Sequence, residues 1–311
     1  MKEKIKTCLA VCVLVLTIPY IVTILFQGDK TSPEPEKVEK ILEKDSEETQ
    51  KDGNQEMNVE EYLVGVVAKE IPLDYQTEAI KAQTVIARTA LVMALETKGE
   101  LPVSMSREEM LKLWGQEGFE ENYRTLEGAV EATKGEILCY QKEPIHAAFH
   151  AVSAGSTRSA AEALQTKEEP YLASVDSKID IPSVDYLKVI FMEKKEFLQK
   201  IKEICPKLET EEKEVLEKVE IIQRDKADYV TQIKVGEEII TGEEFRKNLE
   251  LNSACFYIKE VEGQVRILTK GLGHGLGLSQ YGANELAKEG KDYREILQYY
   301  YQEIQIEKKK R

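Results

Sequence analysis

Residues 59–92 read VEEYLVGVVAKEIPLDYQTEAIKAQTVIARTALV, and this stretch predicts two helices separated by a short break. The first helix begins near Asn58, because Asn58 followed three residues later by Glu61 is the pattern of a capping box. The Ile-Pro pair at 71–72 ends it, since the residue before a proline avoids the α-helical region. The second helix is expected over about 74–96, so the folded part of the chain opens with a helical pair.

Both helices carry an apolar stripe at helical spacing, and polar residues interrupt that pattern. The stripes comprise Val59, Leu63, Val66 and Val67 in the first helix, and Ala79, Ala82, Ile86, Ala90 and Met93 in the second. Glu70 continues the first stripe, where an unpaired ionised carboxylate costs on the order of several kcal/mol. It must therefore be paired, protonated or at a cleft, unless it is simply a surface residue at the helix end. Gln83 lies beside the second stripe, and Arg88 lies in the same buried-looking stretch, where the alternative role is a structural ion pair.

A glycine-rich segment, GLGHGLGLSQYGA, occupies residues 271–283. Its four glycines around His274 leave the backbone open to close approach. It fits neither a dinucleotide fingerprint nor a phosphate loop, and the chain lacks the G-x-S-x-G of a serine-hydrolase elbow. A helix is expected at roughly 279–289. His274 either contacts a ligand directly or is a structural histidine bonded to the backbone.

Residues 135–157 are expected to form a strand, a turn and a second strand, GEILCY-QKEP-IHAAFHAVSAGST. In that arrangement a turn at 141–144 places Cys139 opposite His146, about 5 Å apart at Cβ, close enough for two ligands of one metal ion. His150 is then roughly 13 Å from His146 along the strand, too far to share the ion. The alternative is a buried thiol beside a hydrogen-bonded histidine.

The alternation of helices with hairpins predicts an α+β fold, with a single mixed helix-and-sheet domain over residues 58–308. Residues 183–265 are expected to form a smaller inserted subdomain. Within it the segments EKKEFLQKIKEI, VEIIQRDKADYVTQIKV and GEEFRKNLEL predict a helix, a hairpin and a second short helix.

One transmembrane helix is predicted at residues 8–26, CLAVCVLVLTIPYIVTILF, which carries no charge and is long enough, at about 28 Å, to cross a bilayer. The lysines in residues 1–7 place the N-terminus in the cytoplasm and the remainder outside. A cleaved signal peptide is the alternative, but the apolar run is long and no clear A-x-A-like site follows it. Residues 27–57 are rich in charge and poor in apolar side chains, which predicts a flexible acidic stalk.

Composition excludes several functions. The net charge of −14 argues against a nucleic-acid binder, and residues 31–60 alone contribute −6, from 10 acidic and 4 basic side chains. The rest of the chain is only mildly acidic. Five cysteines are too few for a disulfide framework, and three histidines exclude a histidine-rich metal site.

Three blocks together resemble the stage II sporulation protein D family, which includes the LytB-type amidase enhancers. They are residues 59–92, HAAFHAVSAGSTRSA at 146–160 and GLGHGLGLSQYGANELAKEG at 271–290, with further similarity at 241–256. The resemblance covers nearly all of residues 58–308, and the N-terminal anchor fits it. It implies a peptidoglycan lytic transglycosylase, which cleaves between N-acetylmuramic acid and N-acetylglucosamine and leaves 1,6-anhydro-muramic ends. The family's catalytic glutamate corresponds to Glu70.

The resemblance also implies a setting for the enzyme. It would act on glycan strands stripped of peptides, at the mother-cell membrane during forespore engulfment. Its partners would be a membrane-bound amidase/endopeptidase and a polytopic membrane protein. Candidate substrate contacts are Arg88, Gln83, His274, Ser279, Gln280 and Tyr281, with Tyr62 as a weaker one.

Two alternatives remain open from the sequence. Some clostridial relatives resemble zinc proteins with His and Cys ligands, so Cys139, His146 and His150 are zinc candidates. Ala151 stands where those relatives have a cysteine, so a full ligand set is not evident and no cofactor is expected. The second alternative is a non-catalytic glycan-binding protein or amidase enhancer.

Overall fold

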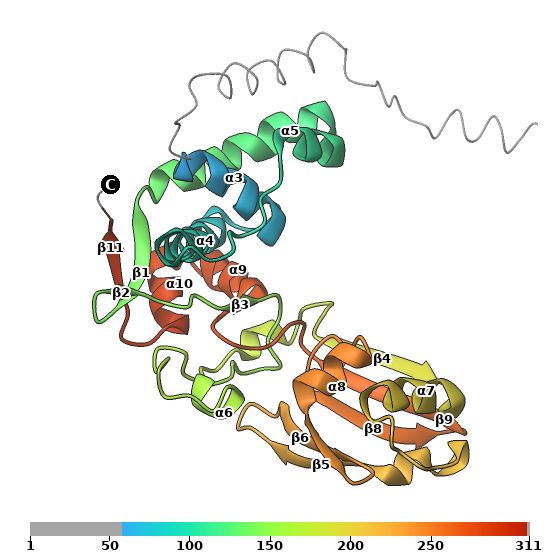
Figure 1. The fold of residues 1–311 in the computed structure, drawn as a ribbon. Coiled ribbons are helices and arrows are strands. Elements are labelled where there is room, and N and C mark those ends of the chain that lie inside the picture. Colours follow the sequence, from blue (N-terminus) through green and yellow to red (C-terminus); the bar gives the residue numbers. More distant parts are fainter. Residues whose placement is uncertain (1–57, 310–311) are drawn as a thin grey trace, which may run out of the picture.

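The computed structural model describes residues 58–309, which form a mixed helix-and-sheet structure with two lobes (Figure 1). The first lobe is mostly helical and contains both ends of the described chain. Its helices are α3 (Val59–Glu70), α4 (Thr77–Thr97), α5 (Arg107–Ala132), α6 (Ala160–Ala163), α9 (Gln280–Lys288) and α10 (Tyr293–Tyr300), with the 3-10 helix η1 (Lys178–Asp180). Its strands are β1 (Glu136–Tyr140), β2 (Glu143–Pro144), β3 (Phe149–His150), β10 (Leu278–Ser279) and β11 (Gln305–Lys308).

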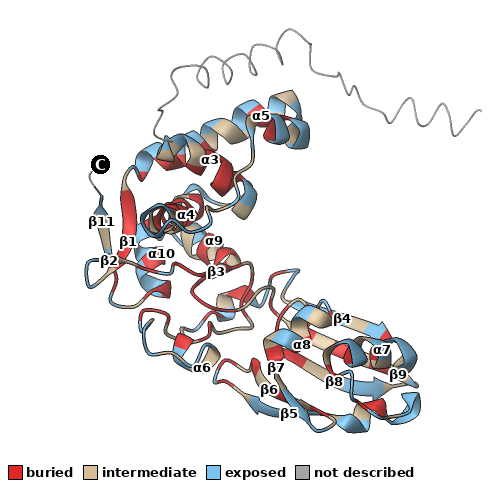
Figure 2. Ribbon diagram, viewed as in Figure 1, coloured by how far each residue is buried: buried red, intermediate tan, exposed pale blue. Residues whose placement is uncertain are grey.

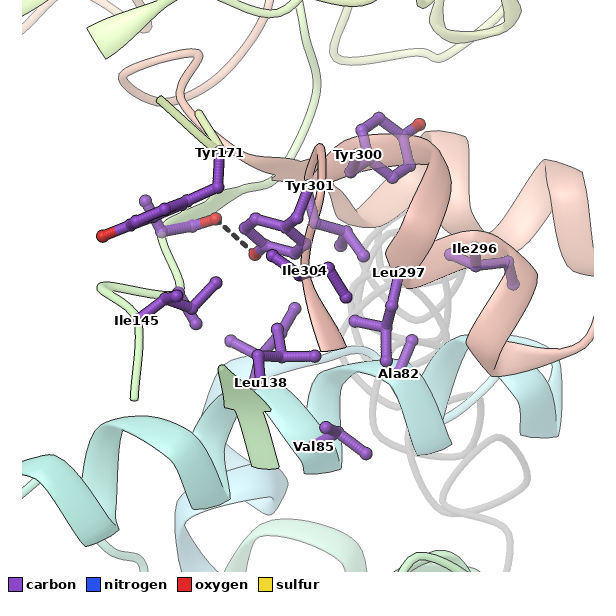
Figure 3. Packing of buried hydrophobic residues seen from close by; sticks show 14 of the residues in the cluster. Ala82, Val85, Leu138, Ile145, Tyr171, Ile296, Leu297, Tyr300, Tyr301 and Ile304 are labelled. Atoms are coloured by element: carbon purple, nitrogen blue, oxygen red, sulfur yellow. Dashed lines mark hydrogen bonds between the residues drawn. The ribbon is translucent and has the colours of Figure 1, made fainter. Parts of the chain in front are cut away.

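The core of the first lobe is formed by α4 together with elements from the far end of the chain. Strand β1 pairs with β11 and β2, while α9 and α10 pack on α4. Figure 3 shows Leu138 and Val85 facing Leu297 across this core, with Tyr301 above them. The hydroxyl of Tyr301 is fully buried and donates to the Ala148 carbonyl at 2.6 Å. The first and last thirds of the sequence therefore share one core.

Helices α3 and α5 form a second apolar layer on α4, with side chains such as Leu63, Val67 and Leu126 fully buried. The close packing depends on Gly65, because a Cβ there would lie 2.3 Å from the Met105 carbonyl oxygen. The Asn58 side chain makes no capping hydrogen bond, so the predicted capping box at this end is wrong.

The second lobe has its own apolar core, which includes Phe197, Val215, Ile233, Phe245 and Ile267. Two three-stranded antiparallel sheets enclose it, β4-β9-β8 and β5-β6-β7, and α7 and α8 cover it (Figure 2). The strands are β4 (Leu187–Met192), β5 (Val219–Arg224), β6 (Val230–Val235), β7 (Glu238–Thr241), β8 (Phe256–Val261) and β9 (Gln264–Lys270). The helices are α7 (Lys194–Ile204), α8 (Gly242–Asn248) and the 3-10 helix η2 (Glu212–Lys218). The three elements predicted within residues 183–265 are present.

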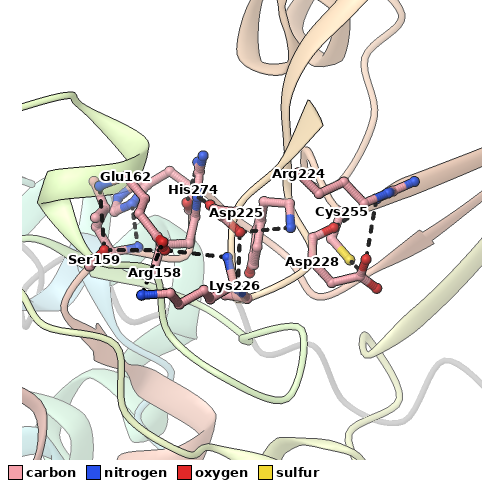
Figure 4. Close-up of polar contacts among 12 residues, drawn as sticks. Arg158, Ser159, Glu162, Arg224, Asp225, Lys226, Asp228, Cys255 and His274 are labelled. Carbon is pink, nitrogen blue, oxygen red and sulfur yellow. Dashed lines mark hydrogen bonds and ion pairs between the residues drawn. The ribbon is translucent and has the colours of Figure 1, made fainter. Parts of the chain in front are cut away.

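Arg158 joins the two lobes. Its guanidinium is buried, pairs with Asp225 at 2.6 Å and Glu243 at 3.0 Å, and donates to the His274 carbonyl at 3.3 Å (Figure 4). It also lies 4.8 Å from the centre of the Tyr229 ring. A buried charge needs this degree of pairing, so the contact holds the second lobe against the glycine-rich segment.

The predicted long hairpin at 135–157 is wrong. Gln141 and Lys142 both have positive φ, so the turn closes within two residues and Cys139 pairs with Pro144. Ile145 still donates to the Leu138 carbonyl, after which residues 146–148 leave the sheet, and β3 pairs in parallel with β10 instead. His146 is therefore not opposite Cys139.

No helix within residues 58–309 is both long and apolar enough to cross a membrane. The predicted cytoplasmic segment, transmembrane helix and stalk, residues 1–57, lie outside the described residues.

Candidate functional site

Glu70 is the last residue of α3, and its side chain is mostly covered by neighbouring elements. The helix stops there because Ile71 is extended, at φ −128°, ahead of Pro72. Burial raises the pKa of Glu70 to about 7, and a hydrogen bond from Gln83 opposes that rise. The negative end of the α3 dipole also disfavours an ionised carboxylate at this position. Glu70 can therefore carry a proton near neutral pH.

Two glutamines hold the Glu70 residue in place. Gln83, fully buried in α4, donates through Nε2 to Glu70 Oε2 at 2.8 Å. Gln280 donates through Nε2 to the Glu70 backbone carbonyl at 2.7 Å and to Gln83 Oε1 at 3.2 Å. Glu70 Oε1 has no hydrogen-bond partner within residues 58–309. One carboxyl oxygen is thus held, and the other remains free to meet a ligand.

The beginning of α9 places Gln280. Ser279 caps the helix by accepting from the Gly282 amide, and its hydroxyl donates to Asp180 Oδ2 at 2.7 Å. Asp180 is fully buried and accepts from the Ser153 amide at 2.6 Å as well. Burial raises the pKa of Asp180 against the lowering effect of these hydrogen bonds. Ser279 therefore has a structural contact, one residue away from the Glu70 network.

The glycine-rich segment lets two chain segments approach closely beneath this network. Leu278 donates to the Ala148 carbonyl, and β10 runs parallel to β3. Gly277 has φ +67°, and a Cβ there would lie 1.8 Å from the Ala148 oxygen. Only glycine fits this position, which is how the segment delivers Gln280 to the end of α3.

His274 and His150 lie together in this segment, with their ring centres 5.8 Å apart. The backbone of Leu276 joins them, because its N–H donates to His274 Nδ1 and its carbonyl accepts from His150 Nδ1. Burial lowers the pKa of both, that of His150 to about 3. Both rings are neutral near pH 7, and the observed contacts of His274 are those of a structural histidine.

Two of the predicted substrate contacts are already engaged elsewhere. Arg88 is buried and pairs with Glu60 at 2.8 Å, and it also donates to the Glu136 and Val130 carbonyls. The Tyr62 hydroxyl donates to the Pro102 carbonyl at 2.8 Å. The structure therefore brings Gln83 and Gln280 to Glu70 but gives Arg88 the contacts of a structural ion pair.

The zinc candidates are separated in space. His146 is exposed and bonds Glu169 at 3.0 Å, while Cys139 is buried beside Pro144. In the part of the chain that the structure describes, no three His, Cys, Asp or Glu side chains gather as a metal site. The pairing of Cys139 with His146 was wrong because the turn is shorter than predicted.

The sequence did not predict a role for three residues, Asp180, Asn284 and Tyr75. Asp180 supports Ser279, and Asn284 accepts from the Gln76 amide at 2.8 Å, tying α9 to the start of α4. Tyr75 is half-buried, and burial together with the charge of Asp74 raises its pKa to about 12. Asn284 directly follows the SQYGA motif, so that motif was a signal for it, whereas nothing local marks Asp180.

Tyr281, one of the predicted substrate contacts, is half-buried next to Gln280, and its backbone amide donates to the Ala151 carbonyl.

Comparison with known proteins gives consistent matches. A family model described as "Stage II sporulation protein" matches residues 47–140. The chain is 33% identical to Stage II sporulation protein D of Bacillus amyloliquefaciens and 34% identical to that of Bacillus subtilis (strain 168), over 98% of this chain and 96% of each relative. It is 26% identical to a protein named Amidase enhancer from Bacillus subtilis (strain 168), over 77% of this chain and 39% of that protein.

Proposed function

The chain belongs to the stage II sporulation protein D family, and we propose that it is a peptidoglycan lytic transglycosylase in which Glu70 is both acid and base. The observation that carries the proposal is the environment of Glu70. Its pKa is raised to about 7, one oxygen is held by Gln83, and the other has no protein partner within residues 58–309. A carboxylic acid poised near neutral pH is what protonation of a glycosidic oxygen requires.

In the first step, protonated Glu70 donates its proton to the oxygen between N-acetylmuramic acid and N-acetylglucosamine. The bond from that oxygen to C1 of the muramic acid breaks, and an oxocarbenium-like state develops. Gln83 donates to Oε2, so Oε1 is the oxygen assigned to the proton transfer. The leaving sugar departs with a free hydroxyl at its 4-position.

In the second step, the Glu70 carboxylate accepts the proton of the muramic 6-hydroxyl as that oxygen attacks C1. A 1,6-anhydro bond forms, and Glu70 returns to its protonated state, so protons and bonds balance over the cycle. Neither a water molecule nor a second carboxylate takes part. The hydrogen bond from Gln83 stabilises the transient carboxylate without abolishing its basicity.

We further propose that residues 8–26 anchor the protein in the cell membrane, with residues 1–7 cytoplasmic and the domain outside. The uncharged apolar run after three lysines supports this orientation. Action in forespore engulfment, alongside a membrane-bound amidase/endopeptidase and a polytopic membrane protein, is the setting that the family suggests.

The test is digestion of purified, peptide-free glycan strands by the full-length protein, with products analysed by mass spectrometry. We expect anhydro-muramic ends from the wild type and a loss of about 10²–10⁴-fold in rate for Glu70→Gln. Glu61→Gln, an exposed glutamate in the same helix, is the matched control and should retain full activity. Anhydro ends released by Glu70→Gln at the wild-type rate would remove Glu70 from the mechanism.

Similarity to the protein named Amidase enhancer favours one second candidate, a non-catalytic glycan-binding role. The same digest separates the two. Retention of glycan strands without new chain ends would support the binding role, whereas new anhydro ends that depend on Glu70 support the enzyme.

A further inference from the structure

Strand β4 forms an apolar edge of the second lobe (Figure 1). It has β9 on one side and no strand on the other among the residues that the structure describes. Ile190 and Met192 pack into the core of the lobe. Leu187, Val189 and Phe191 lie on the opposite face, with exposed fractions of 51, 38 and 54%. Single exposed apolar side chains are ordinary, but three on one face of one strand mark a contact surface.

The backbone groups of the same three residues point away from the sheet. The Tyr186 carbonyl accepts from the Gly271 amide at 2.7 Å, so it faces the β9 side. Successive residues of a strand direct their backbone groups to alternate sides, which turns those of Leu187, Val189 and Phe191 outward. Within residues 58–309 these N–H and C=O groups have no backbone partner. Such a row is a template for a further strand.

Unpaired cations surround this edge. Lys188 lies within β4 and is exposed, and Arg266 of β9 is the direct neighbour of Phe191. Lys259 of β8 lies opposite Arg266. Within residues 58–309 none of these three cationic side chains makes a hydrogen bond or an ion pair. In a chain with a net charge of −14, these uncompensated cations favour an acidic partner.

Two other occupants fit the edge less well. A second copy paired symmetrically about Val189 would place Asp185 opposite Glu193 of that copy and the two Lys188 side chains on a diagonal, so like charges would meet. A bilayer would cover the apolar side chains, but it offers no partner to the outward N–H and C=O groups. An extended polypeptide satisfies the side chains and the backbone together.

We propose that β4 is a docking edge that takes an extended, acidic segment of another protein as a fourth strand of the β4-β9-β8 sheet. The main chain of that segment pairs with the outward groups of Leu187, Val189 and Phe191. Its alternate residues lie on the outer face and are apolar, whereas the residue beside Lys188 is acidic. The surface belongs to the second lobe and does not depend on the reaction proposed for Glu70.

The test is calorimetric titration of the full-length protein with a synthetic peptide, GEVEVEVEG, in which glutamate and valine alternate. We expect saturable binding that Val189→Pro weakens at least about tenfold, because proline removes an outward N–H. That N–H takes no part in the ladder with β9, so the urea midpoint should be preserved. Lys188→Glu should weaken binding up to about fivefold and favour the lysine counterpart, GKVKVKVKG. Lys202→Glu, at an exposed site in α7, is the matched control and should bind like wild type.

Absence of saturable binding would overturn the proposal, as would an unchanged Kd in Val189→Pro. The charge reversal at Lys188 decides the matter if the proline variant fails to fold, and equal affinity of Lys188→Glu for both peptides would count against an acidic partner. Concentration-dependent dimers in sedimentation that Val189→Pro dissociates would assign the edge to a second copy instead. Displacement of the bound peptide by phosphatidylglycerol vesicles would assign it to a lipid surface.

Discussion

The side-chain amide of Gln280 donates to the backbone carbonyl of Glu70 across 2.7 Å, although 210 residues separate them. A carbonyl oxygen only accepts, so the nitrogen of Gln280 must face it. That nitrogen also faces Gln83, which must then present its oxygen to Gln280 and its nitrogen to Glu70. The backbone carbonyl thus sets the orientation of both amides, and through them the side of the carboxyl group that is held.

Gln280→Leu should disturb the hydrogen bonds that orient Gln83 and the Glu70 carboxyl group. It leaves the Glu70 carbonyl and Gln83 Oε1 without a donor, which should cost about 1–3 kcal/mol in stability. Gln83 can then turn, so we expect about a tenfold loss in kcat/KM from poorer alignment of Glu70. Urea unfolding and glycan digestion measure the two effects. Gln305→Leu on the exposed face of β11 is the control. An unaltered kcat/KM in Gln280→Leu would show that Gln280 does not position the Glu70 carboxyl group through Gln83.

Gln83→Met should move the pH dependence of activity. Gln83 supplies the hydrogen bond that lowers the pKa of Glu70, while burial raises it to about 7. Removing the donor leaves burial unopposed, so the alkaline limb of the kcat/KM profile should shift to higher pH. The profile is recorded on peptide-free strands against Gln223→Met, a change at an exposed site in β5. A shift to lower pH would contradict the assignment of Glu70 as the acid.

Stability should also depend on pH through Glu70. Its pKa is raised from 4.5 to about 7 on folding, so the native state binds the extra proton between these values. The resulting contribution is present in full below pH 4.5 and is lost as the pH rises through about 7. Comparing about pH 4 with about pH 8, wild type should lose about 3 kcal/mol relative to Glu70→Gln in urea unfolding. Parallel stability curves for the two proteins would show that Glu70 titrates normally.

Arg88 should prove structural. Arg88→Met leaves the Glu60 carboxylate and two buried carbonyls without their donor, so we expect a loss of about 3–5 kcal/mol in unfolding free energy. KM for glycan strands should not change in the fraction that remains folded. Arg124→Met, at an exposed site in α5, is the matched control. A higher KM with full stability would instead make Arg88 a substrate contact, as the sequence alone had suggested.

Alanine substitutions at Gly277 and Gly263, which have similar φ angles, distinguish the cost of backbone strain from the cost of a steric clash. Gly277 has φ +67° and Gly263 has φ +82°, but only at Gly277 would a Cβ meet a neighbour, the Ala148 oxygen at 1.8 Å. Gly263→Ala should cost about 1–2 kcal/mol from backbone strain alone. Gly277→Ala should cost at least about 3 kcal/mol, or move β10 and with it Gln280. Equal losses of stability for the two variants in thermal unfolding would mean that the backbone around Gly277 and Ala148 can shift to accept a Cβ at little cost.

Local features of the sequence were reliable where packing follows periodicity. The two helices of residues 59–96 were predicted because apolar spacing reports directly on a buried face, and so were the helix α7, the hairpin β5–β6 and the helix α8 of the second lobe. The strands β4, β7, β8 and β9 were not predicted. Helix α5 was not predicted, and its break at Gly115 interrupts the pattern on which such a prediction depends. The hairpin at 135–157 failed for a different reason, because the true partner of β3 lies more than a hundred residues away in β10.

The sequence by itself determined that Glu70 ends a helix on an apolar stripe, and therefore that its carboxyl group is costly to ionise. Only the tertiary structure decided what surrounds that group. Gln83 and Gln280 donate hydrogen bonds to Glu70, whereas Arg88, equally conspicuous in the sequence, forms an ion pair with Glu60. The physical reason is that helix ends and burial arise from neighbours along the chain, whereas hydrogen-bond partners depend on how α9 is carried to α3 by the fold.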